Sequence, residues 1–252
     1  MEPVSVVIIT FNEAENIGRC IDAAAKVAAE VVVLDSYSTD ATEIIARQKG
    51  AHFFQHKFEG HIQQKNKALS FSKYEWVLSL DADEVLSEWA IQQIQQLKDW
   101  NKYDAFSFNR LNNYCGQWIK HGGWYPDRKI RLFKKSAGKW GGTNPHDKFE
   151  LNSRTNVKHI DADILHYSYR TQAEHIAQSQ KFSAIAAKAL YASGIQSVFL
   201  KIVFGPPVKF IRDYVFRLGF FDGRNGFNIA YISAKAVYWK YSALQQLNRT
   251  KE

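Results

Sequence analysis

Apolar and polar positions follow two different periods in the first hundred residues. Short β-branched or aliphatic runs predict buried strands at residues 4–10, 30–35 and 75–80, and a short strand is expected at 51–54. Apolar residues at helical spacing predict helices from residue 17 over about four turns, over 41–49, over 62–72, and from 87 to about 100. Strands that alternate with helices over short connections are typical of a parallel sheet, so we expect an α/β fold.

The periodicity changes after residue 100. Residues 103–110 and 128–134 alternate polar and apolar positions as antiparallel strands do. Residues 160–169, which include His166, precede a predicted helix over 171–193. We expect two aromatic stretches with several glycines, residues 112–127 and 140–147, to be loops; stacking platforms for sugars and simple hairpin packing both account for the first. The predicted fold is therefore a mostly parallel central sheet with added antiparallel elements.

The last sixty residues differ again. Basic residues interrupt every apolar run in 194–252 well before the ~20 apolar residues that a membrane-spanning helix needs. This pattern is typical of amphipathic helices, which attach in the plane of a membrane, cover the main domain or form a dimer interface. We predict a main domain over residues 1–193, with halves at 1–100 and 101–193, and a helical extension over 194–252.

Polar side chains stand where three of the predicted strands end. Thr10-Phe11-Asn12-Glu13 follows the first strand, Asp35 ends the second, and Asp81-Ala82-Asp83-Glu84 ends the fourth. Since ligands of parallel sheets bind beyond the carboxyl ends of the strands, these tips are expected on one rim. Crowded carboxylates repel one another, and a divalent cation with an anionic substrate would balance them; a solvated acidic turn is the plainer alternative.

Smaller signals refine this prediction. Asn12 is a candidate helix cap with Glu15 as its partner, and Glu84 is expected to cap the helix after it. The first strand is not followed by Gly-x-Gly-x-x-Gly or by a Walker loop, which argues against a dinucleotide fold and a P-loop.

Charge and cysteine content bound the location and partners. The net charge of +8 divides into −6 for residues 1–100, +8 for 101–193 and +6 for 194–252. A basic second half suits an anionic partner such as nucleic acid, a membrane surface or a phosphorylated glycan. Two distant cysteines give no disulfide framework or zinc spacing, and Met1 leads almost directly into a strand, so we expect a reducing cytoplasmic location without a signal peptide.

Taken together, the motifs Val4–Glu13, Asp35–Asp40 and Asp81–Asp83 resemble the inverting glycosyltransferases of family two, which have a GT-A fold. The rest of the chain is similar to lipopolysaccharide core glycosyltransferases of the heptose β-1,4-glucosyltransferase type. That second likeness is carried by His121–Lys129, Trp140–Asp147, Leu165–Tyr169 and the tail 210–226. Asp35-Ser36 stands where the family usually has Asp-Asp.

The resemblance implies a UDP-sugar donor, a hexose such as glucose, and Mg²⁺ or Mn²⁺. It assigns metal binding to Asp83, completed by His166, although a hydrogen-bonded core histidine is the alternative for His166. Asp81 would contact the ribose or a metal-bound water, Phe11 would stack on the base, and Lys65 would lie near the base or phosphates. The remaining residues expected at the nucleotide are Thr10, Asn12, Glu13, Asp35 and Ala82.

An inverting transfer also requires a carboxylate that takes the proton of the acceptor hydroxyl. Asp147 is the candidate base, and Asp127 and Glu150 are alternatives that could instead pair with neighbouring Arg128 and Lys148.

The expected activity is transfer of a hexose to a lipopolysaccharide core or similar glycolipid, at the inner face of the cytoplasmic membrane, with 194–252 contacting the membrane. A polyprenyl-phosphate acceptor is an alternative. A nucleotidyltransferase would need a glycine-rich basic loop after the first strand, which Phe11–Glu15 does not provide. A non-catalytic membrane or nucleic-acid module leaves the acidic strand ends unexplained, because they would repel phosphate, so no nucleic-acid partner is expected.

Overall fold

The computed structural model describes residues 2–143, 146–196 and 198–249. The chain forms two compact units, one from residues 1–110 with 127–166 and the other from 111–126 with 167–252. We call these unit 1 and unit 2 and describe each by itself. The helix that follows residue 171 thus groups with the C-terminal helices, and the predicted functional division at residue 193 stays a prediction.

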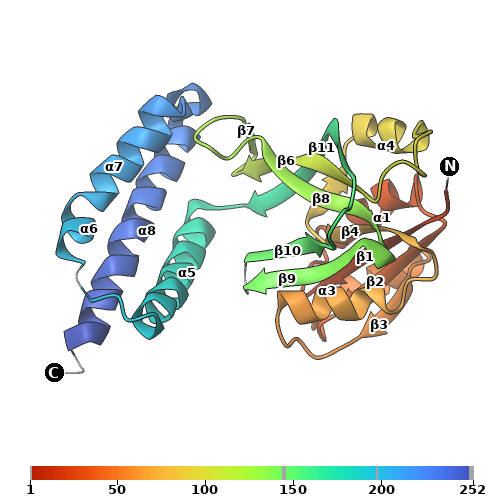
Figure 1. Ribbon diagram of the computed structural model, residues 1–252, viewed down its shortest axis with the longest axis horizontal. Coiled ribbons are helices and arrows are strands. Elements are labelled where there is room, and N and C mark those ends of the chain that lie inside the picture. Colours follow the sequence, from red (N-terminus) through yellow and green to blue (C-terminus); the bar gives the residue numbers. More distant parts are fainter. Residues whose placement is uncertain (1, 144–145, 197, 250–252) are drawn as a thin grey trace. The chain divides into compact units, whose positions relative to one another are not determined.

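A parallel four-stranded sheet forms the first half of unit 1. Its strands are β1 (Val4–Thr10), β2 (Glu30–Asp35), β3 (His52–Gln55) and β4 (Trp76–Asp81), in the order β3-β2-β1-β4 (Figure 1). In this register Thr10 lies beside Asp35, and Ile9 lies beside Asp81. The strand ends that carry the acidic and polar residues therefore share one edge, as the sequence predicted.

Helices α1 (Ile17–Ala25), α2 (Thr42–Gln48), α3 (His61–Leu69) and α4 (Glu88–Gln95) follow the four parallel strands. The apolar residues Ile17, Cys20 and Ile21 of α1 are buried against the sheet. Both α1 and α4 are shorter than their apolar periodicity predicted. The apolar pattern extends past the helix ends because Val27 and Trp100 pack into the same core from outside regular helix.

Two capping predictions were wrong. Asn12 does not cap α1: its φ is +54°, and its side chain accepts a hydrogen bond from the backbone N–H of Thr39 in a neighbouring turn. Helix α1 begins five residues later. The cap of α4 is Ser87, whose hydroxyl accepts from the backbone N–H of Ala90, whereas Glu84 lies in a strand.

Antiparallel strands extend the sheet beyond β4. They are β8 (Asp127–Lys134), β6 (Ala105–Tyr114), β11 (Val157–Tyr169) and β5 (Glu84–Leu86), in that order. The predicted strands at 103–110 and 128–134 are thereby confirmed, whereas β11 forms where no element was predicted. The α/β fold class is confirmed as well. The parallel strands come from the first part of the chain, and helices form its C-terminal end.

The predicted loop at 140–147 was wrong. A short helical turn (η1, Lys135–Ala137) leads into β9 (Gly138–Thr143), which pairs with β10 (His146–Leu151) as a separate two-stranded sheet. Trp140 and Phe149 are buried, and the Phe149 ring stacks on Phe133 with centroids 3.6 Å apart. Aromatic burial thus explains this segment; its residues 144 and 145 lie outside the described residues.

Unit 2 consists of a short hairpin and a set of helices. The end of β6 pairs with β7 (Gln117–Ile119), so part of the predicted loop at 112–127 is a hairpin with Tyr114 and Ile119 buried. The helical elements are α5 (Gln172–Ala192), α6 (Phe199–Val203), α7 (Gly205–Ile211), the π-helical turn η2 (Arg212–Phe216), η3 (Gly219–Asp222) and α8 (Gly223–Arg249).

Long helices α5 and α8 pack against each other, with Ala187 and Leu244 buried between them and the Ser183 hydroxyl donating to the carbonyl of Ala236. The predicted helix at 171–193 is confirmed. No helix in the described part of the chain combines the length and the apolar character that crossing a membrane requires.

Candidate active site

The rim formed by the ends of β1, β2 and β4 holds most of the predicted site residues. Thr10 is buried, and its hydroxyl finds no hydrogen-bond partner among the described residues. Ala82 is also buried, and its backbone N–H donates to the carbonyl of Ile9, which continues the β1–β4 pairing one residue past β4. The rim is thus closed by backbone pairing at the point where the acidic residues begin.

Three of the predicted nucleotide-contacting residues, Asp35, Asn12 and Glu13, make hydrogen bonds with the segment that follows β2. The buried carboxylate of Asp35 accepts from the backbone N–H and the hydroxyl of Ser38. The Ser38 hydroxyl oxygen also accepts from the backbone N–H of Asn12, at 2.7 Å, and that of Thr42 accepts from the N–H of Glu13, at 2.8 Å. These bonds hold the loops after β1 and β2 together.

Phe11 stands out in this polar region. Its side chain is 57% exposed, although it lies between Thr10, which is buried, and the hydrogen-bonded Asn12. An exposed aromatic ring on a braced loop offers a flat apolar face for stacking.

Lys65 on α3 joins two of the predicted site residues. Its ammonium group lies 3.0 Å from Oδ1 of Asp81 and 2.8 Å from Oδ2 of Asp147, and its side chain is only 4% exposed. The same ammonium lies 4.5 Å from the centre of the Trp140 ring. Residues from three distant parts of the sequence are thereby brought to one point on the rim.

A second basic residue, Arg131 on β8, balances the acidic cluster from the other side. Its guanidinium lies 3.1 Å from Asp81 and 2.5 Å from Glu84, and both Arg131 and Glu84 are buried. Burial by itself would raise the pKa of Asp81, but the charges of Lys65 and Arg131 outweigh it and hold that pKa well below its ordinary value. Burial opposes the charge of Arg131, yet Glu84 and Asp81 raise its pKa.

The charge repulsion expected at this edge is therefore balanced largely by the chain itself. Glu84, expected at the start of a helix, is instead a fully buried partner of Arg131. The sequence did not predict either arginine of this cluster as a site residue. They are Arg131 and Arg110, and the guanidinium of Arg110 lies 3.7 Å from Glu84. A signal existed: Arg131 interrupts the apolar run Ile130–Phe133 in a predicted strand, where an unpaired charge would be costly.

Asp83 and His166 form a separate pair beside this network. His166 lies on β11, opposite Glu84 of β5, and its Nε2 is 3.1 Å from Oδ2 of Asp83. The two side chains are 17% and 24% exposed, so solvent or a ligand reaches them. The structure thus brings together the two residues predicted to hold a metal.

The donor set fits a divalent ion that takes its other ligands from a substrate. One carboxylate and one imidazole suit Mn²⁺ and are acceptable to Mg²⁺ when phosphate oxygens complete the shell. Among the described side chains, no group of three or more His, Cys, Asp or Glu is placed to hold a metal without such help.

The three candidate bases differ in their surroundings. Asp147 is linked to the rim through Lys65. Asp127 pairs with Arg110 at 2.7 Å, and Glu150, whose side chain is 43% exposed, lies 3.5 Å from Lys148. Of these carboxylates, Asp147 alone shares an ion-pair partner with Asp81 in the part of the chain that the structure describes.

Known proteins share this fold. The mannosyltransferase PcManGT from Pyrobaculum calidifontis, solved in complex with GDP-Man and Mn²⁺, aligns over 100% of this chain and 76% of its own, with a TM-score of 0.52 and 16% identity. That likeness shows the fold, an α/β arrangement of the GT-A type.

Sequence relatives are named as sugar transferases. An uncharacterized glycosyltransferase of Rickettsia bellii (strain RML369-C) is 28% identical over 97% of this chain and 87% of its own length. The lipopolysaccharide core biosynthesis glycosyltransferase LpsC of Rhizobium meliloti (strain 1021) is 26% identical over 95% of this chain and 93% of its own. The family model described as glycosyl transferase family 2 matches residues 5–161. The chain therefore belongs to glycosyl transferase family 2, as its motifs predicted.

Proposed function

We propose that this glycosyltransferase moves a hexose, such as glucose, from a UDP-sugar to a lipopolysaccharide core or similar glycolipid, with inversion at the anomeric carbon. The observation that carries the proposal is the Asp83–His166 pair, placed at the strand edge beside the carboxylates that Lys65 joins. The name of the Rhizobium relative LpsC supports the choice of acceptor.

The nucleotide would lie along the ends of β1 and β2. The exposed ring of Phe11 is suited to stacking on the base, and the buried hydroxyl of Thr10 is available for a polar contact. Asn12, Glu13 and Asp35 would act mainly by holding the loops that surround the nucleotide, because their hydrogen bonds join those loops. Ala82 would form the wall beneath it.

Asp83 and His166 would hold the Mg²⁺ or Mn²⁺ ion. When bound, a divalent ion neutralises the negative charge that develops on the leaving diphosphate. Lys65 places a further positive charge on the same edge, and in the donor complex its ammonium would be shared between Asp81 and the phosphates. Asp81, in turn, would accept hydrogen bonds from the ribose or from a metal-bound water.

Asp147 would act as the base for the acceptor hydroxyl. Its carboxylate needs to leave or share the ammonium of Lys65 to take up a proton, and the phosphates of a bound donor offer that ammonium an alternative partner. Donor binding would thereby prepare the base. The acceptor hydroxyl loses its proton to Asp147 as its oxygen bonds to the anomeric carbon, and the bond to the diphosphate breaks.

The acceptor proposal includes a location. A glycolipid is presented at a membrane surface, so residues 194–252 would contact the inner face of the cytoplasmic membrane peripherally.

A donor screen tests the proposal. UDP release would be measured for a panel of UDP- and GDP-sugars with Mg²⁺, with Mn²⁺ and with EDTA, first without acceptor and then with a lipopolysaccharide core or a polyprenyl phosphate. We expect one UDP-hexose to be hydrolysed slowly in a metal-dependent manner and faster with the core acceptor. Faster release with polyprenyl phosphate alone would overturn the acceptor, and metal-independent release would overturn the role of the ion.

A further inference from the structure

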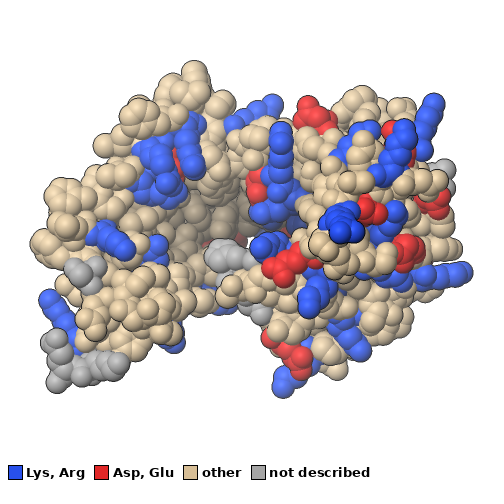
Figure 2. All heavy atoms as spheres, viewed as in Figure 1, with Lys and Arg blue, Asp and Glu red and all other residues tan. Residues whose placement is uncertain are grey.

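Positive charge is concentrated in unit 2. This unit carries 13 Lys and Arg residues against 4 Asp and Glu, whereas unit 1 carries 20 against 21. Figure 2 shows Lys and Arg side chains over the helices of unit 2 with little Asp or Glu on the same face. Unit 2 thus has a net charge of +9 and unit 1 of −1. The whole excess of positive charge belongs to the unit that lacks the candidate active site, which indicates a separate anionic partner.

An apolar stripe runs along the same helices. Its members recur every three or four residues through α6, α7 and η2, which places them on one helical face, and each is 47–66% exposed. They are Leu200, Phe204, Val208, Ile211 and Val215. A continuous exposed stripe of this length marks a contact surface for a protein or a membrane.

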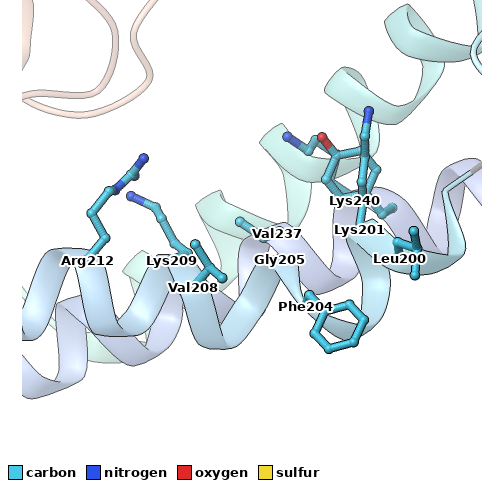
Figure 3. A pocket seen from close by; sticks show the side chains of 10 residues that line it. Leu200, Lys201, Phe204, Gly205, Val208, Lys209, Arg212, Val237 and Lys240 are labelled. Atoms are coloured by element: carbon cyan, nitrogen blue, oxygen red, sulfur yellow. The ribbon is translucent and has the colours of Figure 1, made fainter.

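A groove of about 590 Å³ lies between α6, α7 and α8 (Figure 3), and three residues of the stripe, Leu200, Phe204 and Val208, line it. Phe204, Val208 and Val237 contribute apolar surface to it, and no acidic side chain among the described residues lines it. Its basic lining residues are Lys201, Lys209, Arg212 and Lys240. In Figure 3, Lys209 and Arg212 point to a different side of the helix from Phe204. Each follows a member of the stripe by one residue, about 100° round the helix, so the basic side chains flank the stripe.

The four cations divide into two pairs. Lys209 and Arg212 both contact the buried carboxylate of Asp213, which partly neutralises them. Lys201 and Lys240 instead lie 5.4 Å and 4.5 Å from the centre of the Tyr241 ring. Within the described residues neither is within 4 Å of a carboxylate, so their charges are available to an anion.

We propose that the groove binds the phosphate headgroup of an anionic phospholipid, with Lys201 and Lys240 as its contacts. The apolar stripe would enter the boundary between headgroups and acyl chains, as in-plane amphipathic helices do. This inference specifies the membrane contact of the proposed function and rests on it. A nucleic acid fits less well, because the stripe is mainly aliphatic and aliphatic side chains do not stack on bases.

Vesicle co-sedimentation tests the site. The full chain would be mixed with vesicles of phosphatidylcholine alone and with vesicles that contain phosphatidylglycerol. We expect binding to the anionic vesicles and about 30-fold weaker binding for Lys201→Gln/Lys240→Gln, since each basic residue near an anionic surface is worth roughly 1 kcal/mol. The matched control is Lys181→Gln/Lys188→Gln on α5, which removes the same charge from exposed positions of the same unit and should retain most of the binding.

A separate variant tests the contact of the apolar stripe with the membrane. Phe204→Ser should weaken vesicle binding by about tenfold or more through lost apolar burial, and the 59% exposure of Phe204 predicts that the fold survives. Equal losses in the groove and control variants would overturn the groove as a site, and so would tighter binding of the wild type to RNA than to vesicles. UDP release without vesicles should be unchanged in all three variants, which separates a failure here from a failure of the proposed transferase activity.

Discussion

His166 Nε2 lies 3.1 Å from Asp83 Oδ2, although 83 residues separate the two in sequence. The contact depends on the pairing of β11 with β5, which sets His166 opposite Glu84 and therefore next to the acidic strand end. Asp83 pairs with His166, whereas Lys65 and Arg131 form ion pairs with Asp81, Glu84 and Asp147. Asp81 and Asp83, which only Ala82 separates in sequence, thus have different charged partners.

Asp83→Ala should abolish transfer, since it removes the only predicted carboxylate ligand of the metal. We expect kcat/KM to fall by on the order of 10²–10³, the scale of losing a group that stabilises developing charge. The measurement is UDP release over a Mn²⁺ titration, with circular dichroism to show that the fold is intact. Asp22→Ala, on an exposed Asp paired with Lys49, is the matched control. Near-normal turnover in Asp83→Ala would contradict the metal role.

Asp147→Asn should bind the donor but lose transfer. An amide keeps a hydrogen-bond acceptor for Lys65 but cannot take up the acceptor's proton, so rates should fall by about 10²–10⁴-fold. Calorimetric UDP binding and acceptor-dependent turnover separate the two effects. Glu150→Gln, on a more exposed carboxylate, should be near normal. If Glu150→Gln is inactive and Asp147→Asn is active, the base must be reassigned.

Arg131→Met should destabilise the protein strongly. It leaves Glu84 buried without its closest cation, and breaking a buried pair costs about 3–5 kcal/mol of unfolding free energy. Adding Glu84→Gln should recover part of that loss, because the double variant leaves no uncompensated charge at Glu84. Urea unfolding measures all three proteins. Lys26→Met, at an exposed pair with Glu88, should change stability by less than about 1 kcal/mol, and an equal loss there would contradict the assignment.

His175 should make stability depend on pH. Burial lowers the pKa of this histidine to about 4, and its Nδ1 lies 3.2 Å from the Tyr114 hydroxyl. The unfolded chain takes up a proton near pH 6.5, before the folded chain does. Stability is therefore complete above pH 6.5 and declines as pH falls towards 4, by about 3 kcal/mol.

The test is urea unfolding at pH 7 and pH 4.5 for the wild type and for His175→Gln, which cannot titrate in this range. The loss between the two pH values should be clearly smaller in the variant. The same loss in both proteins would assign the acid sensitivity to other groups.

Much of the grouping of polar residues at the strand ends was predictable from sequence. Buried strands have short apolar runs, and a parallel sheet places their carboxyl ends on one edge, so Thr10, Asp35 and Asp81 were expected together. The capping roles of Asn12 and Glu84 were not borne out, because tertiary partners, Thr39 for one and Arg131 for the other, use those side chains instead.

By itself, the sequence determined the α/β class, the meeting of the parallel strands' polar ends at one edge and the membership of the family, since these depend on local periodicity and short motifs. Only the tertiary structure decided which charges meet. Whether Lys65 joins Asp81 to Asp147, and whether Arg131 reaches Glu84, depends on strand register and on helix packing between segments 16 to 82 residues apart. Which charged side chains pair depends on their distance in space, and periodicity along the chain does not specify that distance.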